Sequence, residues 1–214
     1  MKKIIFCLLA ITPCITFAQF GIKAWLNFAN VTKASSINNS SRSGFHAGLF
    51  LAPSSKGIIG SRTELLFSRQ GYNYKTNTNT GNVNLDYIII PQYMVLNITK
   101  YLQIQLGGQM AYLINAKVDS SSGQAASSGS KALDFYNKFD YGYGGGIEIH
   151  PVSGLLIGAR VNISLGNVFQ DSANYSSGTP PSFIPKVNVK NNVFQIFVGW
   201  RFGKRPSQSK KPEQ

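Results

Sequence analysis

The segment 193–202 alternates large apolar residues with mostly polar ones. Its even positions are Phe194, Ile196, Val198, Trp200 and Phe202. Its odd positions include Gln195, Gly199 and Arg201. Because successive side chains of a strand point to opposite faces, this pattern predicts a strand with one apolar and one mostly polar face. Such a strand suits the core of a soluble sandwich, or an outer-membrane barrel in which lipid covers the apolar face.

Seven earlier segments extend this pattern along the chain. They span residues 20–28, 44–51, 59–70, 85–98, 102–114, 140–149 and 155–165. Segment 85–98 is apolar on both faces, so alternation does not assign its orientation. Pro91 within it lacks a backbone N–H, which predicts a local bulge. Eight strands are expected in total.

The connections between these segments alternate in length. Long polar stretches at 32–43, 72–83, 116–138 and 167–191 alternate with short links at 53–57, 99–100 and 151–154. This rhythm is typical of an up-and-down outer-membrane barrel with short periplasmic turns and long outer loops. No apolar run beyond the N-terminal segment approaches the roughly 20 residues of a membrane-spanning helix. We therefore predict an all-β, eight-stranded antiparallel transmembrane barrel with both termini on the periplasmic side.

The first 18 residues have the pattern of a signal peptide. Lys2 and Lys3 precede an apolar run, and small residues before position 19 predict cleavage after Ala18. Acylation of Cys14 is the alternative, but Pro13 stands where a lipoprotein signal has a small residue. Both cysteines lie in this leader, so the mature chain is expected to hold no disulfide or cysteine metal site. The predicted regions are a signal peptide at 1–18, a barrel at 19–203 and a basic periplasmic tail at 204–214.

The chain is strongly basic. Its formal charge is +13, and removal of Lys2 and Lys3 with the leader lowers it to +11. Such a charge is common in nucleic-acid-binding proteins, but an exported chain with scattered basic residues does not fit that class. Outer-membrane lipid and lipopolysaccharide phosphates are the expected partners of the positive charge, and the barrel-assembly machinery is an expected partner during insertion.

Several charged residues fall on the predicted inner face. The main set is Lys23, Arg62, Glu64, Glu148, Arg160 and Arg201, and His46 and Asp140 share this face. Side chains fill the interior of an eight-stranded barrel, and an isolated buried charge costs several kcal/mol or more. We therefore expect a structural network in which the two glutamates bridge the arginines. An ion-conducting path through the same residues is the alternative.

Aromatic residues fall near the predicted strand ends, where aromatic side chains favour the level of the lipid head groups. Those near the periplasmic ends are Tyr101, Trp200 and Phe202. Those near the outer ends are Phe67, Tyr112, Tyr141 and Tyr143. Trp25 departs from this pattern, because alternation places it on the inner face.

Catalytic signatures are weak. The chain has two histidines, His46 and His150, far apart and without an acidic partner at a recognisable spacing. They predict neither a nucleophile–base pair nor a metal site. The glycine run 142–146 is not followed by a helical pattern, so it does not predict a phosphate loop; inner-face glycines there are expected to make room for bulky side chains such as Phe197 or Trp25. We expect no enzyme activity and no cofactor.

In order, these segments resemble the PorT-like outer-membrane β-barrel family of Bacteroidetes-type bacteria. The matching stretches are 20–30, 44–50, 64–71, 87–91, 142–146, 158–167 and the closing aromatic strand. The resemblance implies the barrel fold and an outer-membrane location, and one branch of the family takes part in protein secretion. The family often has a carboxylate where Ile89 stands, and many barrels end on the aromatic residue rather than continuing past Phe202.

The outer loops carry aromatic and lysine residues suited to a protein or glycan partner, because rigid scaffolds often present binding residues on loops. They are Tyr72, Tyr74, Phe135, Tyr136, Phe169, Tyr175 and Phe183, with Lys75, Lys131, Lys138 and Lys186. The leading hypothesis is a non-enzymatic structural or loop-mediated interaction protein. The alternatives are a component of a secretion apparatus and, third, a small channel.

Overall fold

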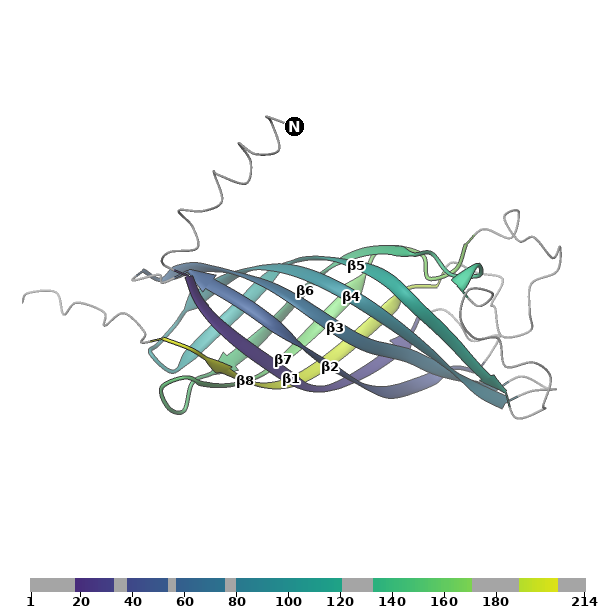
Figure 1. The fold of residues 1–214 in the computed structure, drawn as a ribbon, viewed down its shortest axis with the longest axis horizontal. Coiled ribbons are helices and arrows are strands. Elements are labelled where there is room, and N and C mark those ends of the chain that lie inside the picture. Colours follow the sequence, from purple (N-terminus) through teal and green to yellow (C-terminus); the bar gives the residue numbers. More distant parts are fainter. Residues whose placement is uncertain are drawn as a thin grey trace, which may run out of the picture.

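The computed structural model is a closed barrel of eight antiparallel strands, as the alternation predicted (Figure 1). It describes residues 18–32, 38–53, 57–75, 80–120, 133–170 and 189–203. The strands are β1 (Ala18–Val31), β2 (Ser40–Pro53), β3 (Ile59–Lys75), β4 (Thr80–Asn97), β5 (Leu102–Ser120), β6 (Phe139–Ile149), β7 (Leu155–Ser164) and β8 (Asn191–Arg201). Each strand pairs with the next in sequence, and β8 pairs with β1. Residues 1–17 of the predicted leader and the whole predicted tail lie outside the described residues, and Ala18 is the first residue of β1. Within these ranges, the structure contains no helix with the length and hydrophobicity to cross a bilayer.

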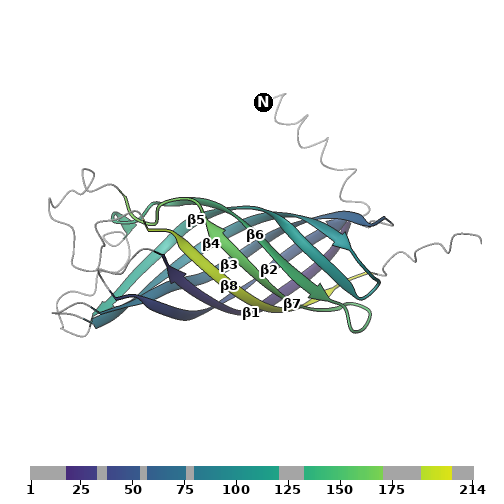
Figure 2. The same ribbon diagram turned by 180° about the vertical axis from the view of Figure 1, so that it is seen from behind.

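The two ends of the barrel differ. Links of only a few residues join β2 to β3, β4 to β5 and β6 to β7, as predicted. Ala18 pairs with Pro53, and the N–H of Phe202 donates to the carbonyl of Phe20, so both ends of the described chain lie beside these links. We call this the turn end and the opposite one the loop end. The strands cross the barrel obliquely between them (Figure 2).

The outer face of the barrel is apolar over most of its height. Exposed residues include Leu26 on β1, Leu49 on β2, Leu106 on β5 and Val161 on β7, with the polar alternates turned inward. This is the alternation expected for a strand between lipid and a polar interior. The sequence left the orientation of β4 open. In the structure, its odd-numbered residues from Tyr87 to Val95 are buried and face the interior.

Three of the predicted loops are shorter than expected, and the first of them, predicted at 32–43, ends where β2 begins at Ser40. Strand pairing between β3 and β4 continues to Lys75–Thr80, and β5 extends to Ser120. Most of the predicted loop 72–83 and the start of 116–138 are therefore strand. The reason is that the alternation inverts here: Tyr72 and Val83 are buried while polar residues face outward. A strand that continues beyond the bilayer meets water on its outer face, so its polar residues were mistaken for loop.

The bulge predicted at Pro91 is wrong. Pro91 pairs with Gln109 of β5 in an unbroken register, and the register shift between these strands lies between Asp86 and Tyr87. On its other side, β4 pairs with β3 before and after Ile90 and Pro91 but not at these two residues. The register is the same on both sides of this gap. The missing N–H of proline is thus accommodated by a local gap in the ladder rather than by an extra residue.

Trp25 does not join the buried interior. Its side chain is 52% exposed, whereas the inner-face neighbours Lys23 and Asn27 are almost fully buried. The inner-face glycine Gly158 instead makes room for Phe197, because a Cβ there would overlap the Phe197 ring. On β6, a Cβ at Gly144 would meet the side chain of Asn162. Within the glycine run 142–146, Gly144 therefore makes room for Asn162, whereas Phe197 is accommodated by Gly158 on β7, outside the run, and Trp25 by none of these glycines.

We expect the Leu106→Arg variant to lower the free energy of unfolding by about 2–4 kcal/mol, because Leu106 faces outward well inside the apolar band. Val152→Arg, in the exposed turn between β6 and β7, is the matched control and is expected to change it by less than about 1 kcal/mol. Urea unfolding in phospholipid vesicles measures both. Equal effects would contradict the placement of lipid around β5.

Candidate functional site in the barrel interior

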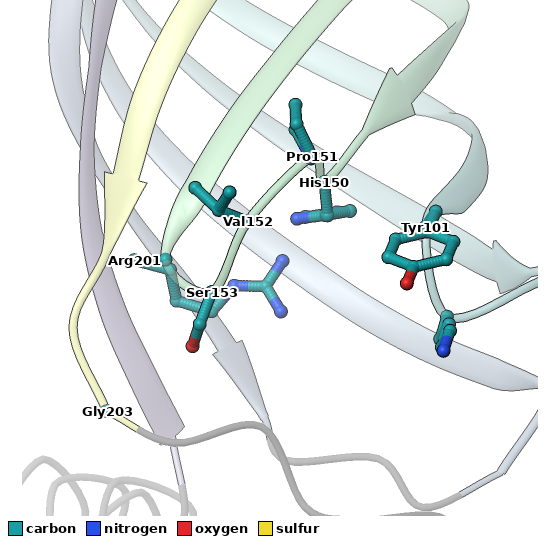
Figure 3. Close-up of a pocket in the computed structure, with 9 residues that line it drawn as sticks. Tyr101, His150, Pro151, Val152, Ser153, Arg201 and Gly203 are labelled. Carbon is teal, nitrogen blue, oxygen red and sulfur yellow. The ribbon is translucent and has the colours of Figure 1, made fainter.

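A pocket of about 440 Å³ opens at the turn end. Its walls are the link between β4 and β5, the link between β6 and β7, and the end of β8. The side chains of Lys100, His150 and Arg201 line it together with Tyr101 and Ser153 (Figure 3). Gly154 in the β6–β7 link has φ of 89°, a conformation that favours glycine. The pocket is thus built from short, constrained segments.

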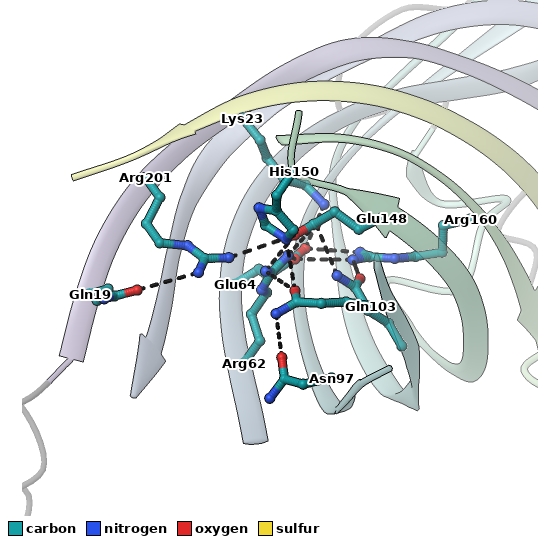
Figure 4. A network of polar contacts seen from close by, with 11 residues as sticks. Gln19, Lys23, Arg62, Glu64, Asn97, Gln103, Glu148, His150, Arg160 and Arg201 are labelled. Atoms are coloured by element: carbon teal, nitrogen blue, oxygen red, sulfur yellow. Dashed lines mark hydrogen bonds and ion pairs between the residues drawn. The ribbon is translucent and has the colours of Figure 1, made fainter. Parts of the chain in front are cut away.

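Deeper in the barrel, the structure brings together the six charged residues that the sequence placed on the inner face (Figure 4). We call these the ionic cluster: Lys23, Arg62, Glu64, Glu148, Arg160 and Arg201. They come from β1, β3, β6, β7 and β8. All are at least nine-tenths buried, so each charge depends on its partners rather than on water.

Glu64 on β3 is the centre of one half of the cluster. It accepts a hydrogen bond from Lys23 Nζ at 2.8 Å. Arg160 on β7 donates to both of its carboxylate oxygens, at 2.9 and 3.1 Å. Such bidentate pairs are among the stronger charge-assisted hydrogen bonds. Since neither β1 nor β7 neighbours β3 in the ring, these contacts tie together strands that the ladder does not connect.

Glu148 on β6 is the centre of the other half. Arg62 donates to its two oxygens at 2.5 and 2.8 Å, again across the barrel. Gln105 Nε2 donates to it at 2.9 Å, and His150 Nε2 lies 2.9 Å from its Oε1. Arg201 is more distant, with 3.8 Å between its NH2 and Glu148 Oε1. The carboxylate therefore joins β3, β5 and β6 and contacts the residues of the turn-end pocket.

Aromatic rings cover the cations of the cluster. Arg160 stacks 3.9 Å from the centre of the Tyr93 ring, and Lys23 Nζ lies 4.2 Å from that of Phe197. Arg62 lies 4.8 Å from the Phe50 ring. A cation over an aromatic face gains most when water is excluded. The rings thus fill space and stabilise charge together.

A neutral polar layer follows toward the loop end. Tyr93 donates to Asn162 Oδ1 at 2.9 Å, and Asn162 donates to Gln195 at 2.9 Å. Gln195 in turn donates to Asn27 at 3.1 Å, and Asn27 Oδ1 lies 2.7 Å from His46 Nδ1. This chain of hydrogen bonds crosses from β4 to β7, β8, β1 and β2. The side-chain amides of this layer hydrogen-bond to one another rather than to a charged group.

An apolar cluster fills the interior at the loop end. It combines strand residues such as Tyr72, Leu85 and Leu113 with Tyr136 and Phe169 from the connections. Tyr136 and Phe169 form an isolated bridge, and their rings lie 5.2 Å apart. Ile89, the position where the resembling family often has a carboxylate, is buried in this cluster. In the described residues, the interior therefore passes from ionic to neutral polar to apolar between the two ends.

The other candidates named from the sequence lie outside the ionic cluster. His46 belongs to the neutral layer, and Asp140 accepts a hydrogen bond from Ser164 near the loop end. The aromatics expected at the membrane interfaces are Phe67, Tyr101, Tyr112, Tyr141, Tyr143, Trp200 and Phe202. All but the half-buried Phe67 are exposed, and Tyr101 also lines the turn-end pocket. Tyr101, Trp200 and Phe202 lie at the turn end, and the others lie farther toward the loop end.

Sequence reasoning missed some members of the interior network. Gln103 and Gln105 were on the correct face, but nothing in their pattern singled out Gln105 as a partner of Glu148 and Arg160, or Gln103 as a partner of Arg62. Tyr93 lies in segment 85–98, where apolar residues on both faces gave no prediction of which side chains point inward. His150 was placed at a turn, whereas its ring reaches Gln103 at 3.0 Å. In the described part of the chain, no group of three His, Cys, Asp or Glu residues could hold a metal ion.

The comparisons with known proteins match this geometry. The family model "Outer membrane protein beta-barrel domain" covers residues 16–170. The chain belongs to that family. It is a β-barrel of the outer membrane of a Gram-negative bacterium. No relative of significant similarity was found among the curated proteins.

Two solved structures share the fold at low sequence identity. Ail, the attachment invasion locus protein of Yersinia pestis, is 17% identical, with a TM-score of 0.50. Neisserial surface protein A is 16% identical, with a TM-score of 0.52. Each match covers 86% of this chain and 99% of the other protein. At this identity the likeness concerns the fold alone.

We expect Glu64→Gln to destabilise the barrel by about 3–5 kcal/mol, because it leaves Lys23 and Arg160 buried without their countercharge. Asp119→Asn is the matched control. It breaks only the exposed pair with Lys117 and should cost less than about 1 kcal/mol. Denaturant unfolding of both variants in vesicles gives the comparison; a loss for Glu64→Gln no larger than the control would show that the cluster does not stabilise the fold.

Proposed function

We propose that this protein is a non-enzymatic outer-membrane barrel that acts through its ends, and that its loop end contacts a protein or glycan outside the cell. The observation that carries the proposal is the filled interior. Arg62, Arg160, Tyr93 and Phe197 are among the largest fully buried side chains, and they project into the barrel from β3, β7, β4 and β8. An interior filled in this way favours recognition at the ends over transport through the middle.

The loop end has the form of a scaffold that presents loops. β3, β4 and β5 run past β7 and β8 as a three-stranded extension, visible as the longest strands of the barrel (Figure 1). The inner face of this extension packs on the apolar cluster, while Asn73, Lys117 and Asp119 lie on its outer face. Hydrogen bonds from Arg42 to Asn73 and Asn84 link β2 to the same extension. Rigid strands that carry polar connections support a role in binding.

A photo-crosslinking residue placed at Asn73 or Lys117 in intact cells is expected to give adducts with an external protein or glycan, because both positions lie on the polar extension at the loop end. The matched control places it at Val152, on the turn end. Mass spectrometry of the purified adducts identifies what was captured. Adducts at Val152 but none at either loop-end position would contradict recognition at the loop end.

Because the ionic, neutral polar and apolar layers fill the described interior beyond the turn-end pocket, the folded protein in planar bilayers is expected to show no stable unitary conductance. A paired measurement on Arg160→Ala, which removes one of the largest buried side chains, tests whether space inside the barrel is what limits conduction. Stable unitary steps from the unaltered protein would refute the closed interior and favour the channel hypothesis.

A role in protein secretion is the second candidate. It rests on the ordered resemblance of segments such as 20–30 and 87–91 to PorT-like barrels. Deletion of the gene with measurement of secreted proteins, followed by complementation, separates it from loop-mediated binding. Cargo loss restored equally by the unaltered gene and by a version with residues 121–130 shortened would favour secretion over the loop-end role.

A further inference from the structure

The turn-end pocket has the chemistry of an anion site. Three basic side chains line it: Lys100, His150 and Arg201. No Asp or Glu is among its lining residues in the described part of the chain. In Figure 3 the guanidinium of Arg201 and the imidazole of His150 both project into the space between the two links, with the hydroxyl of Ser153 at its margin.

The ionic cluster behind the pocket adds positive potential. It holds four cations against the two carboxylates Glu64 and Glu148, an excess of +2 in formal charge. The carboxylates pair mainly with Lys23, Arg160 and Arg62, and Glu148 also lies 2.9 Å from Nε2 of the pocket residue His150. Arg201 lies on the pocket side of the cluster, with a 3.8 Å contact to Glu148. A cleft with low-dielectric walls focuses such a potential on a ligand of opposite sign.

We propose that this pocket binds a phosphate group, supplied either by a lipid head group or by a soluble phosphate compound. The planar guanidinium of Arg201 matches two phosphate oxygens, and His150, Lys100 and Ser153 add donors from the other walls. The volume of about 440 Å³ exceeds what a bare phosphate needs, so the group can carry a substituent such as glycerol. Exposed Tyr101 lines the pocket, and exposed Trp200 and Phe202 flank the lining residue Arg201 in the sequence; aromatic side chains of this kind favour the level of the lipid head groups.

Trp200 provides a direct readout of the pocket. A Cβ built on Gly154, a pocket residue, would lie 2.9 Å from two atoms of the Trp200 ring. The chain has only one other tryptophan, Trp25, three residues along β1 from Ile22, the partner of Trp200. In a Trp25→Phe background, the fluorescence of the refolded full-length protein therefore reports on Trp200 alone.

The test titrates this protein, in an uncharged maltoside detergent at constant ionic strength, with inorganic phosphate and with dihexanoyl phosphatidylglycerol. Sodium chloride is the reference anion. A saturable change with phosphate or with the lipid, absent with chloride, supports the site. A lipid affinity at least tenfold higher than that of phosphate assigns the source to the membrane, and similar affinities assign it to soluble compounds. No saturable change with either probe, or the same change with chloride, overturns the proposal.

Variants locate the binding. Arg201→Gln is expected to weaken it about tenfold or more, since a hydrogen bond to a charged group contributes about 1.5–3 kcal/mol. Lys100→Gln is expected to weaken it about threefold, and Lys117→Gln, at the loop end, is the control expected to leave it unchanged. Heat-modifiable gel migration confirms folding of each variant. If Arg201→Gln does not fold, Lys100→Gln decides; unchanged binding there, or equal weakening by Lys117→Gln, overturns the proposal.

Discussion

The pairing of two buried carboxylates with buried cations is the constraint on which the rest of the interior depends. Glu64 and Glu148 lie on β3 and β6, which are not neighbours, and each is bound by an arginine that reaches across the barrel. An unpaired charge at either position would cost several kcal/mol. The two arginine–glutamate pairs therefore limit how far opposite walls can separate, which the strand ladder alone does not do.

The arrangement of layers follows from this constraint. Charges are concentrated toward the turn end, amides satisfy one another beyond them, and an apolar cluster fills the loop end. The apolar cluster lies at the level where β3 to β5 extend and carry polar instead of apolar residues on their outer face. Above the membrane the barrel is thus built like a water-soluble sheet, apolar inside and polar outside, while within the membrane it is the reverse.

The sequence by itself determined the number of strands, their antiparallel order and the face of most side chains. These follow from period-two alternation and from the rhythm of short and long links, both of which are local properties. Alternation also identified Lys23, Arg62, Glu64, Glu148, Arg160 and Arg201 as inner-face residues. It failed for β4, because that strand faces lipid on one side and aromatic or apolar neighbours on the other.

Only the tertiary structure decided which groups meet. The partners Arg62–Glu148 and Arg160–Glu64 are 86 and 96 residues apart, and which of them approach depends on the register and tilt of strands around the closed ring. The same holds for Gln105 and His150, whose roles depend on the position of Glu148. The extension of β3 to β5 was also hidden, because a polar residue facing water on a strand has the same composition as one in a loop. The local sequence pattern specifies which face of a strand a side chain occupies, whereas closure of the barrel specifies which side chains come into contact.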